Sequence, residues 1–299
     1  MDKEEAWAIV NAIDRKQRKS LLSSGDIHQR DEALHYLSGI EHDAEAMACL
    51  GGQYYEDENY PLAEKYYLAS YEAGNKGIAS GLGFIYFYGR VGTPDYKKAF
   101  RYFSEAKELG DKEAAMKIAD MYDRGLGVDK DPAKYEEILR SLWDSLKDDN
   151  RLFEPVPEVA HRLAYIDMQR GENEEAASLL RHGRAFITQR IHYSDFWGNF
   201  IVARRIEKLL GELGLVDVSY PDIFDLFFCL SSPSSYTLTY AGKDYEIVSF
   251  VDEGKVRVKL DEEPFASIED FLRKGVIKGK RVYSLEHGCD YLLRRKEDE

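Results

Sequence analysis

A 36-residue period runs through the middle of this 299-residue sequence and constrains its fold more than any single motif. Ala63, Ala99 and Tyr135 stand at this interval, and a pair of bulky residues follows each of them three and four positions later. Gly74 and Gly110 recur at the same interval. Sequence periods of about 20–50 residues are typical of repeat architectures. The period therefore predicts a stack of similar units rather than a domain built around one core.

The first helix expected in each unit carries a common signature: an apolar residue, a small residue next to it, and a tyrosine four positions after the apolar one. The three copies are Leu50-Gly51-Tyr54, Leu82-Gly83-Tyr86 and Ile118-Ala119-Tyr122. Residues four apart share one face of an α-helix. The small residue would let the two helices of a hairpin pack closely, and the next hairpin would cover the apolar face that remains. We therefore expect a solenoid of helical hairpins.

Weaker units flank these three copies. A fourth would have Leu163 and Ala164 in its first helix, and a degenerate unit with residues 31–40 as its second helix would precede the first copy. Residues 194–214 have the pattern of one more amphipathic helix. The apolar segment 220–230 would then cap the last hairpin or anchor the next domain.

The segment GLGVDKD, residues 125–131, could be a ligand loop or a connector. It lacks the lysine and hydroxyl spacing of a phosphate loop and the third glycine of a dinucleotide loop. A calcium loop places acidic ligands before its glycine, whereas Asp129 and Asp131 follow Gly127. The second and third units simply have four more residues between their helices than the first and fourth. We expect the glycines to turn the chain, and Asp95 and Asp131 to cap the helices that follow.

Together these residues resemble the Sel-1-like repeat family, a relative of the tetratricopeptide repeats. The family pattern of Leu-Gly-x-x-Tyr, Gly-x-Gly-Val, Asp, Lys-Ala and an aromatic pair is matched over residues 44–146 and less closely to about 190. The resemblance implies a right-handed superhelix that acts as an adaptor for proteins or peptides and has no catalytic residues. Tyr135 in a small-residue position, and the missing aromatic pair of the fourth unit, are departures that predict less regular stacking there.

Composition narrows the classes of partner and compartment. The net charge of -14 argues against general nucleic-acid binding and against docking on anionic membranes. No apolar run is long enough to span a membrane, and residues 1–20 lack a signal-peptide core. Cys49, Cys229 and Cys289 show no pairing pattern, which is typical of a reducing compartment. We predict a cytoplasmic protein with no cofactor and no metal.

Candidate partner-binding residues lie on a second arc of each first helix. Positions two, five and six after the Leu/Ile position fall roughly 130° from the core arc, where a solenoid tends to expose its concave surface. The residues predicted to bind a partner are Tyr55, Phe84, Phe87, Tyr88, Asp120, Asp123 and Tyr165. The aromatic residues of the second unit would form an interface cluster, and the aspartates could meet a basic group. That Phe84 and Phe87 pack against neighbouring helices is an open alternative.

Residues 236–299 change to a period of two, the pattern of β-strands. YTLTY, YEIVSF and VRVKL are expected strands, with hairpin turns at AGKD and DEGK, which gives a three-stranded antiparallel meander. A short helix capped by Ser267 and a further strand would follow. SSPSS, residues 231–235, has the composition of a linker. The chain therefore ends in a small α+β module.

Two features of this module could carry chemistry. Residues 273–281 contain five basic residues and no acidic one, but no aromatic base-stacking pattern accompanies them, which favours a solvated turn over a phosphate or nucleic-acid contact. Glu286, His287, Cys289 and Asp290 are close in sequence. A Cys–His enzyme needs the pair oriented by the fold and the thiol activated, which neighbours in one loop rarely achieve. We do not expect catalysis or zinc binding there.

The sequence thus predicts a mainly α protein with four parts. These are a divergent N-terminal hairpin or cap (1–43), the solenoid (44–190), capping helices (191–230) and the α+β module (231–299). The predicted function is a non-enzymatic adaptor that binds a protein or peptide through its concave face. Two alternatives stay open: repeats that recruit substrate to an enzymatic C-terminal module, and an acidic immunity-type protein that masks a basic partner.

Overall fold

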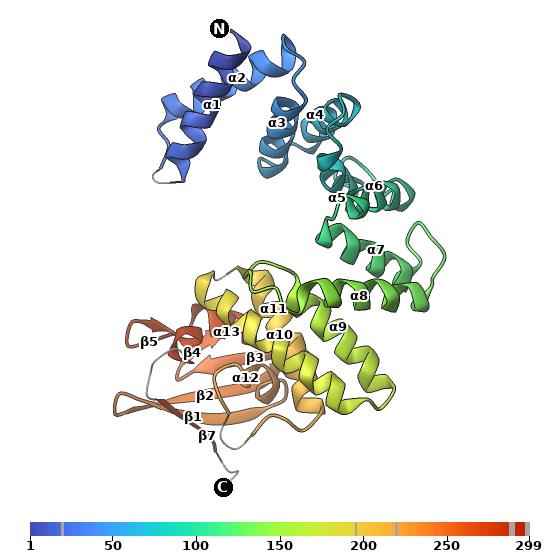
Figure 1. The fold of residues 1–299 in the computed structure, drawn as a ribbon. Helices are drawn as coiled ribbons and strands as arrows, with labels where there is room; N and C mark the ends of the chain where they lie inside the picture. Colours follow the sequence, from blue (N-terminus) through green and yellow to red (C-terminus); the bar gives the residue numbers. More distant parts are fainter. Residues whose placement is uncertain (19–20, 195, 219–220, 287–290, 297–299) are drawn as a thin grey trace. The chain divides into compact units, whose positions relative to one another are not determined.

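The computed structural model describes residues 1–18, 21–194, 196–218, 221–286 and 291–296 (Figure 1). Contacts between Cα atoms divide the chain into two compact units, residues 1–138 (unit 1) and residues 139–299 (unit 2). The predicted divisions near residues 43, 190 and 230 remain predictions.

Unit 1 is a run of helical hairpins in chain order (Figure 1). Its helices are α1 (Lys3–Gln17), α2 (Ser24–Gly39), α3 (Ala44–Glu56), α4 (Tyr60–Glu72), the 3₁₀ turn η1 (Lys76–Ile78), α5 (Ala79–Phe87), α6 (Tyr96–Glu108) and α7 (Lys112–Arg124). The next helix, α8 (Pro132–Leu146), begins in unit 1 and ends in unit 2. The predicted solenoid of helical hairpins is confirmed.

The core of unit 1 repeats from hairpin to hairpin. Leu50 and Leu82 are fully buried, as their position in the signature predicts. Two of the three signature tyrosines stack on the second helix of their own hairpin: Tyr54 on Tyr66, with ring centroids 5.5 Å apart, and Tyr86 on Tyr102, at 5.7 Å. Tyr122 instead meets Phe100 of the preceding hairpin edge to face at 5.6 Å. Tyr54 and Tyr86 therefore carry the packing that the signature predicts.

The loop at residues 125–131 joins α7 to α8. Asp131 Oδ1 accepts a hydrogen bond from Lys134 N at 3.0 Å, and Asp95 Oδ1 accepts one from Lys98 N at the same distance. The two loops also share a second contact, because the backbone N–H of each aspartate donates to the carbonyl of its signature tyrosine at 2.9 Å. The loop is the predicted connector, and its aspartate is the predicted helix cap.

Unit 2 continues the helical pattern and then changes to a sheet. Its elements after α8 are α9 (Val156–Gln169), α10 (Asn173–Tyr193), α11 (Trp197–Glu212), α12 (Leu226–Cys229), α13 (Ile268–Lys274) and the 3₁₀ turn η2 (Val282–Glu286). Helices α9 and α10 form a hairpin against which α11 packs. Helix α11 is the amphipathic helix predicted over residues 194–214, and Ser267 caps α13 as predicted, its Oγ accepting from Asp270 N.

The sheet of unit 2 is antiparallel throughout its described part. Its strands are β1 (Ser234–Tyr240), β2 (Lys243–Asp252), β3 (Lys255–Leu260), β4 (Glu263–Phe265) and β7 (Tyr291–Arg295), in the order β4-β3-β2-β1-β7. A separate hairpin joins β5 (Val276–Ile277) to β6 (Lys280–Arg281). The predicted meander is confirmed. Strand β1 begins at Ser234, inside the predicted linker, because Ser234 N donates to Ser249 Oγ of β2 at 3.0 Å.

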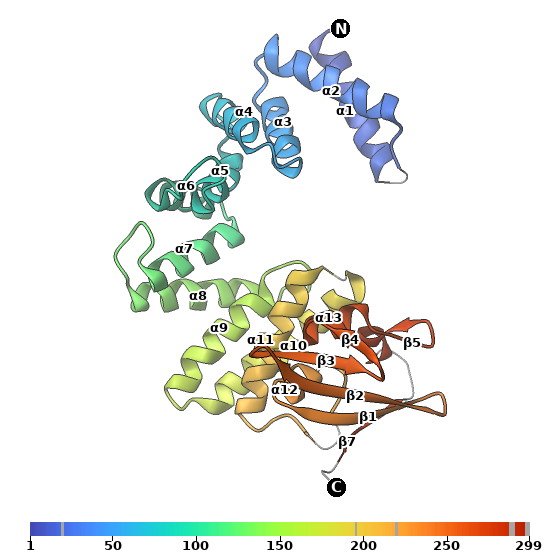
Figure 2. The same cartoon turned by 180° about the vertical axis from the view of Figure 1, so that it is seen from behind.

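Helices cover one face of this sheet (Figure 2). Alternate residues along the strands, such as Leu238, Ile247 and Val258, are buried on that face. Arg204 of α11 pairs with the buried Glu269 of α13 at 2.7 Å, and Tyr236 Oη donates to the Val218 carbonyl at 3.1 Å. The C-terminal strands and the end of the helical part therefore share one packed unit.

Candidate functional site

The structure separates the predicted partner-binding residues into two groups. Tyr55 on α3, the α5 aromatic residues and the two aspartates of α7 belong to unit 1. Tyr165 belongs to α9 of unit 2, where its side chain is exposed. Binding by Tyr165 stays a prediction, separate from the site built in unit 1.

Phe84, Phe87 and Tyr88 come together at the end of α5. The Phe84 ring stacks on Tyr88 with centroids 6.1 Å apart, and Phe87 meets Tyr88 edge to face at 5.1 Å. Phe84 and Phe87 also contact Phe103 of α6, at 5.0 and 6.1 Å, and are half-buried. Tyr88 is 48% exposed. The two phenylalanines thus pack partly into the hairpin, whereas Tyr88 presents a ring to solvent.

Lys117 of α7 completes this cluster, and sequence reasoning missed it. Its ammonium lies 5.5, 5.5 and 5.4 Å from the ring centroids of Phe84, Phe87 and Tyr88, and donates to Tyr88 Oη at 3.0 Å. Such cation–π contacts stabilise both the charge and the ring arrangement. Lys117 stands one position before the Ile118 core position, outside the arc considered. The sequence feature that could have drawn attention to Lys117 is its position three residues before Asp120, on the same side of one helix.

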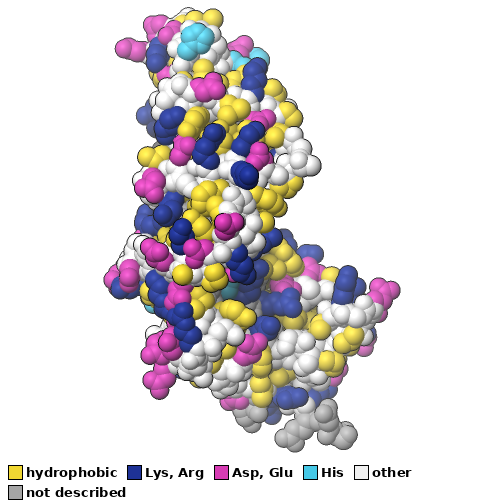
Figure 3. All heavy atoms as spheres, turned by 90° about the vertical axis from the view of Figure 1, so that its right-hand side faces the viewer, with side chains coloured by type: hydrophobic (Ala, Val, Ile, Leu, Met, Phe, Trp, Pro, Cys, Tyr) yellow, Lys and Arg dark blue, Asp and Glu magenta, His cyan; other side chains and the backbone are white. Residues whose placement is uncertain are grey.

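A second cation extends the cluster toward α3. The Arg90 guanidinium lies 4.7 Å from the ring centroid of Tyr60 and 5.5 Å from that of Tyr88, and Tyr55 meets Tyr60 edge to face at 5.3 Å. The connected set forms what we call the aromatic–cation surface: Tyr55, Tyr60, Phe84, Phe87, Tyr88, Arg90 and Lys117. Hydrophobic side chains are interspersed with Lys and Arg on the face of unit 1 that Figure 3 presents.

The two predicted aspartates are less open to a partner than their positions imply. Asp120 is half-buried and already has an interaction within the chain. Asp123 is half-exposed and lies 3.9 Å from Lys130 of the following loop. An exposed pair at that distance contributes little to stability, so Asp123 remains available to a basic group.

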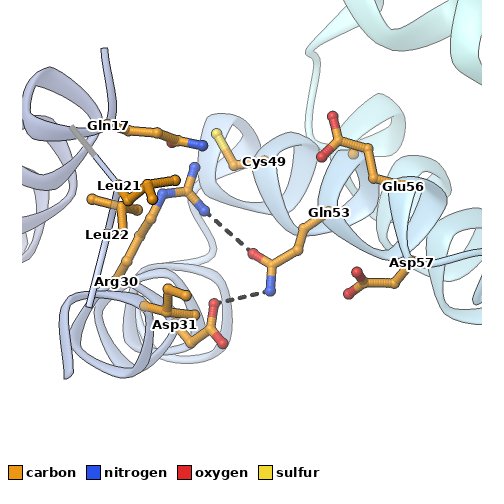
Figure 4. Close-up of a pocket in the computed structure, with 11 residues that line it drawn as sticks. Gln17, Leu21, Leu22, Arg30, Asp31, Cys49, Gln53, Glu56 and Asp57 are labelled. Carbon is orange, nitrogen blue, oxygen red and sulfur yellow. Dashed lines mark hydrogen bonds between the residues drawn. The ribbon is translucent and has the colours of Figure 1, made fainter. Parts of the chain in front are cut away.

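A pocket of about 680 Å³ lies at the N-terminal end of unit 1 (Figure 4). Residues from the end of α1, the loop after it, α2 and α3 line it. Gly52 and Glu56, positions two and six of the predicted arc on α3, are among them. Arg30 donates to Gln53 Oε1 at 3.2 Å, and Gln53 donates to Asp31 Oδ1 at 2.9 Å. We call this site the N-terminal pocket.

The described cysteines have protonated thiols at neutral pH. Burial raises the pKa of Cys49, which lines the N-terminal pocket, and raises that of Cys229 to about 11. A thiol in this state is a poor nucleophile. Among the side chains that the structure describes, no group of three or more His, Cys, Asp or Glu residues is placed to hold a metal ion.

A buried charge cluster in unit 2 was also not predicted. Arg184 of α10 pairs with Glu207 of α11 at 2.7 Å, and with Asp222 and Asp225 at 2.6 and 3.1 Å. Burial raises the pKa of Glu207 to about 8, although Arg184 opposes this shift. Among the described residues, none gives Glu207 Oε2 a hydrogen-bond partner. One guanidinium therefore contacts three acidic side chains between α10, α11 and the segment before α12.

Of the two features of the C-terminal module that could carry chemistry, the structure describes the basic stretch. His287, Cys289 and Asp290 lie outside the described residues. The basic stretch 273–281 runs from the end of α13 through the β5–β6 hairpin. Lys278 donates to the Ala241 carbonyl at 2.9 Å, and Lys274 pairs with Asp270 at 2.6 Å.

None of the helices in the described ranges has both the length and the apolar character that crossing a bilayer requires.

Comparison with known proteins places this chain among repeat proteins. The Sel1 repeat family model matches residues 31–75, 79–111 and 112–134, about a third of the chain. A solved Sel1 repeat protein from Oxalobacter formigenes is 22% identical with a TM-score of 0.47, and the match covers 62% of this chain and 70% of that one. No curated protein matches.

A second solved structure is c5321, a protective antigen present in uropathogenic Escherichia coli strains that displays an SLR fold. It is 17% identical with a TM-score of 0.44, and the match covers 62% of this chain and 45% of that chain. The family match begins in α2 and continues through the hairpins that carry the aromatic–cation surface. Such repeats are typically non-catalytic scaffolds for protein interaction. The chain therefore contains Sel1 repeats over residues 31–134.

Proposed function

We propose that this chain is a non-enzymatic cytoplasmic adaptor that binds a protein or peptide partner through the aromatic–cation surface of unit 1. Tyr88, which contacts both Lys117 and Arg90, is the proposed anchor. Phe84 and Phe87 pack against the Tyr88 ring. Asp123 is the proposed contact for a basic group of the partner.

The contacts of Lys117 carry this proposal. Three rings and one ammonium from two successive hairpins hold each other in place without a ligand, so little side-chain freedom is lost when a partner binds. Tyrosine and arginine are the residue types that most often dominate binding energy at interfaces. The surface is also continuous over α3, α4, α5 and α7, which suits an extended partner segment.

Affinity capture from the native cell tests the proposal with one variant and one matched control. Tyr88→Ala removes a half-exposed ring, and we expect partner affinity to fall roughly 30-fold, as for an interface hot spot of about 2 kcal/mol. Tyr193→Ala removes a more exposed ring from unit 2 and should leave capture unchanged. If the wild type and Tyr88→Ala capture the partner equally well and have the same circular dichroism spectrum, the proposal is wrong.

A further inference from the structure

The N-terminal pocket has an acidic wall and an apolar wall. Glu56 and Asp57 at the end of α3 are exposed, and neither side chain has a hydrogen bond or ion pair with the described residues. On the other side, Leu21 is 97% exposed and Ile27 is 49% exposed. The Arg30–Gln53–Asp31 hydrogen bonds run across the pocket between these walls (Figure 4). A ligand that fits this pocket would thus carry a basic group at one end and an apolar group at the other.

The charge of the pocket favours a cationic ligand. Residues 31–60 contain eight Asp or Glu residues and no Lys or Arg. Arg30, the cation in the pocket lining, is already paired with Asp14 at 2.7 Å. Lys16, next to the lining residue Gln17, is paired with Asp26 at 2.6 Å. Glu56 and Asp57 therefore present uncompensated negative charge, which attracts a basic group of a partner.

The exposed apolar side chains of the pocket favour a ligand that also has an apolar group. Leu21 and Ile27 gain free energy when a ligand removes their surfaces from water. A pocket of about 680 Å³ is in the size range of sites that enclose several side chains. Gly52 also lines the pocket.

We propose that the N-terminal pocket binds a partner segment in which basic residues lie next to leucine-like apolar residues. The basic side chain pairs with Glu56 and Asp57, and the apolar one packs on Leu21 and Ile27. This inference rests on the proposed function, since it assigns a second contact for the same partner and the chemistry of what binds there.

Fluorescence polarisation tests the chemistry with three labelled peptides. The first has a Lys-Arg pair between leucines, the second has Glu-Glu in place of the pair, and the third has serines in place of the leucines. We expect the first peptide to bind most tightly, with an affinity that falls as salt rises. Glu56→Gln with Asp57→Asn should weaken it about fivefold, as for two exposed ion pairs.

A control with the same charge change is Glu32→Gln with Glu108→Gln, two exposed residues outside the pocket lining, which should bind like the wild type. Leu21→Ser should weaken the first peptide but not the third. Alkylation of Cys49, followed by mass spectrometry, should slow when the first peptide is bound, because Cys49 lines the pocket. Equal binding of the basic and acidic peptides, or no effect of the Glu56/Asp57 substitutions, overturns the inference.

The outcomes separate this inference from the proposed function. If the affinity for the captured partner is unchanged in Glu56→Gln with Asp57→Asn but falls in Tyr88→Ala, the pocket assignment is wrong and the adaptor surface stands. If that affinity is unchanged in Tyr88→Ala but falls in the pocket variant, the aromatic–cation surface is wrong and the pocket is the binding site.

Discussion

The ring of Tyr67 on α4 lies against the backbone of Gly51 on α3, so that a β-carbon built at position 51 would come within 2.4 Å of Tyr67 Cδ1. Gly83 and Phe103 repeat this relationship in the next hairpin, with 2.5 Å to Phe103 Cδ1. Tyr67 and Phe103 stand 36 residues apart. The period seen in the sequence is thus the spacing of a packing contact, in which a missing side chain on one helix admits an aromatic ring from the other.

Gly51→Ala tests this contact. The new methyl group overlaps the ring, so we expect a loss of roughly 1–3 kcal/mol in the free energy of unfolding, despite the better helix propensity of alanine. Urea denaturation followed by circular dichroism measures the loss. Gly52→Ala is the control in the same helix, because its β-carbon would approach no described atom closer than 3.7 Å. It should be neutral or stabilising by up to about 1 kcal/mol. Equal losses at both positions would show that ring packing does not select glycine.

Gly127→Ala tests the connector loop. Gly127 has a φ of +74°, and a β-carbon there would lie 2.3 Å from the Tyr96 carbonyl oxygen, which is backbone and cannot rotate away. Gly110→Ala also meets a positive φ, of +89°, but has open space around it. We expect Gly110→Ala to cost about 1–2 kcal/mol of backbone strain, and Gly127→Ala to lower the urea midpoint further. A smaller loss for Gly127→Ala would mean that the loop does not pack against the preceding hairpin.

The buried Glu207 makes the stability of unit 2 depend on pH. Burial, and to a smaller extent Asp225 and Asp222, raise the pKa of Glu207 from an ordinary value of 4.5 to about 8, although Arg184 opposes the shift. Between these two values Glu207 holds a proton in the folded state that it has lost in the unfolded state, so the contribution of Glu207 to stability falls as pH rises from about 4.5 to about 8. The slope reaches at most about 1.4 kcal/mol per pH unit.

Glu207→Gln should remove this slope, because glutamine resembles the protonated acid and still accepts a hydrogen bond from Arg184. Urea midpoints at several pH values, followed by the fluorescence of Trp143 and Trp197 in unit 2, measure the effect. Glu212→Gln, on the same helix but half-exposed, should keep the wild-type slope. An unchanged slope in Glu207→Gln would assign the pH dependence to other groups.

Much of the fold could be predicted because its contacts recur at fixed spacing. The Leu-Gly-x-x-Tyr signature predicted the hairpins, and the alternating strands with their turns predicted the meander. The pairing of β7 with β1 could not be predicted, because it joins Leu293 to Leu238 across most of the module and no local pattern records the register.

The candidate site was predicted less completely than the fold. Helix arithmetic located Phe84, Phe87 and Tyr88, since all three lie on one short helix and its end. Lys117 and Arg90 were missed because their role depends on which rings neighbouring hairpins place beside them. The N-terminal pocket depends on how the loop after α1 approaches α3, which a repeat pattern starting at α2 does not describe.

Photo-cross-linking at position 88 tests the central claim most directly. A benzoylphenylalanine placed at Tyr88 in the native cell should form a covalent adduct with a protein partner, whereas the same group at the exposed Leu109, at the end of α6, should form none. Adducts from position 109 but not from position 88 would contradict a partner-binding surface on α5 and α7.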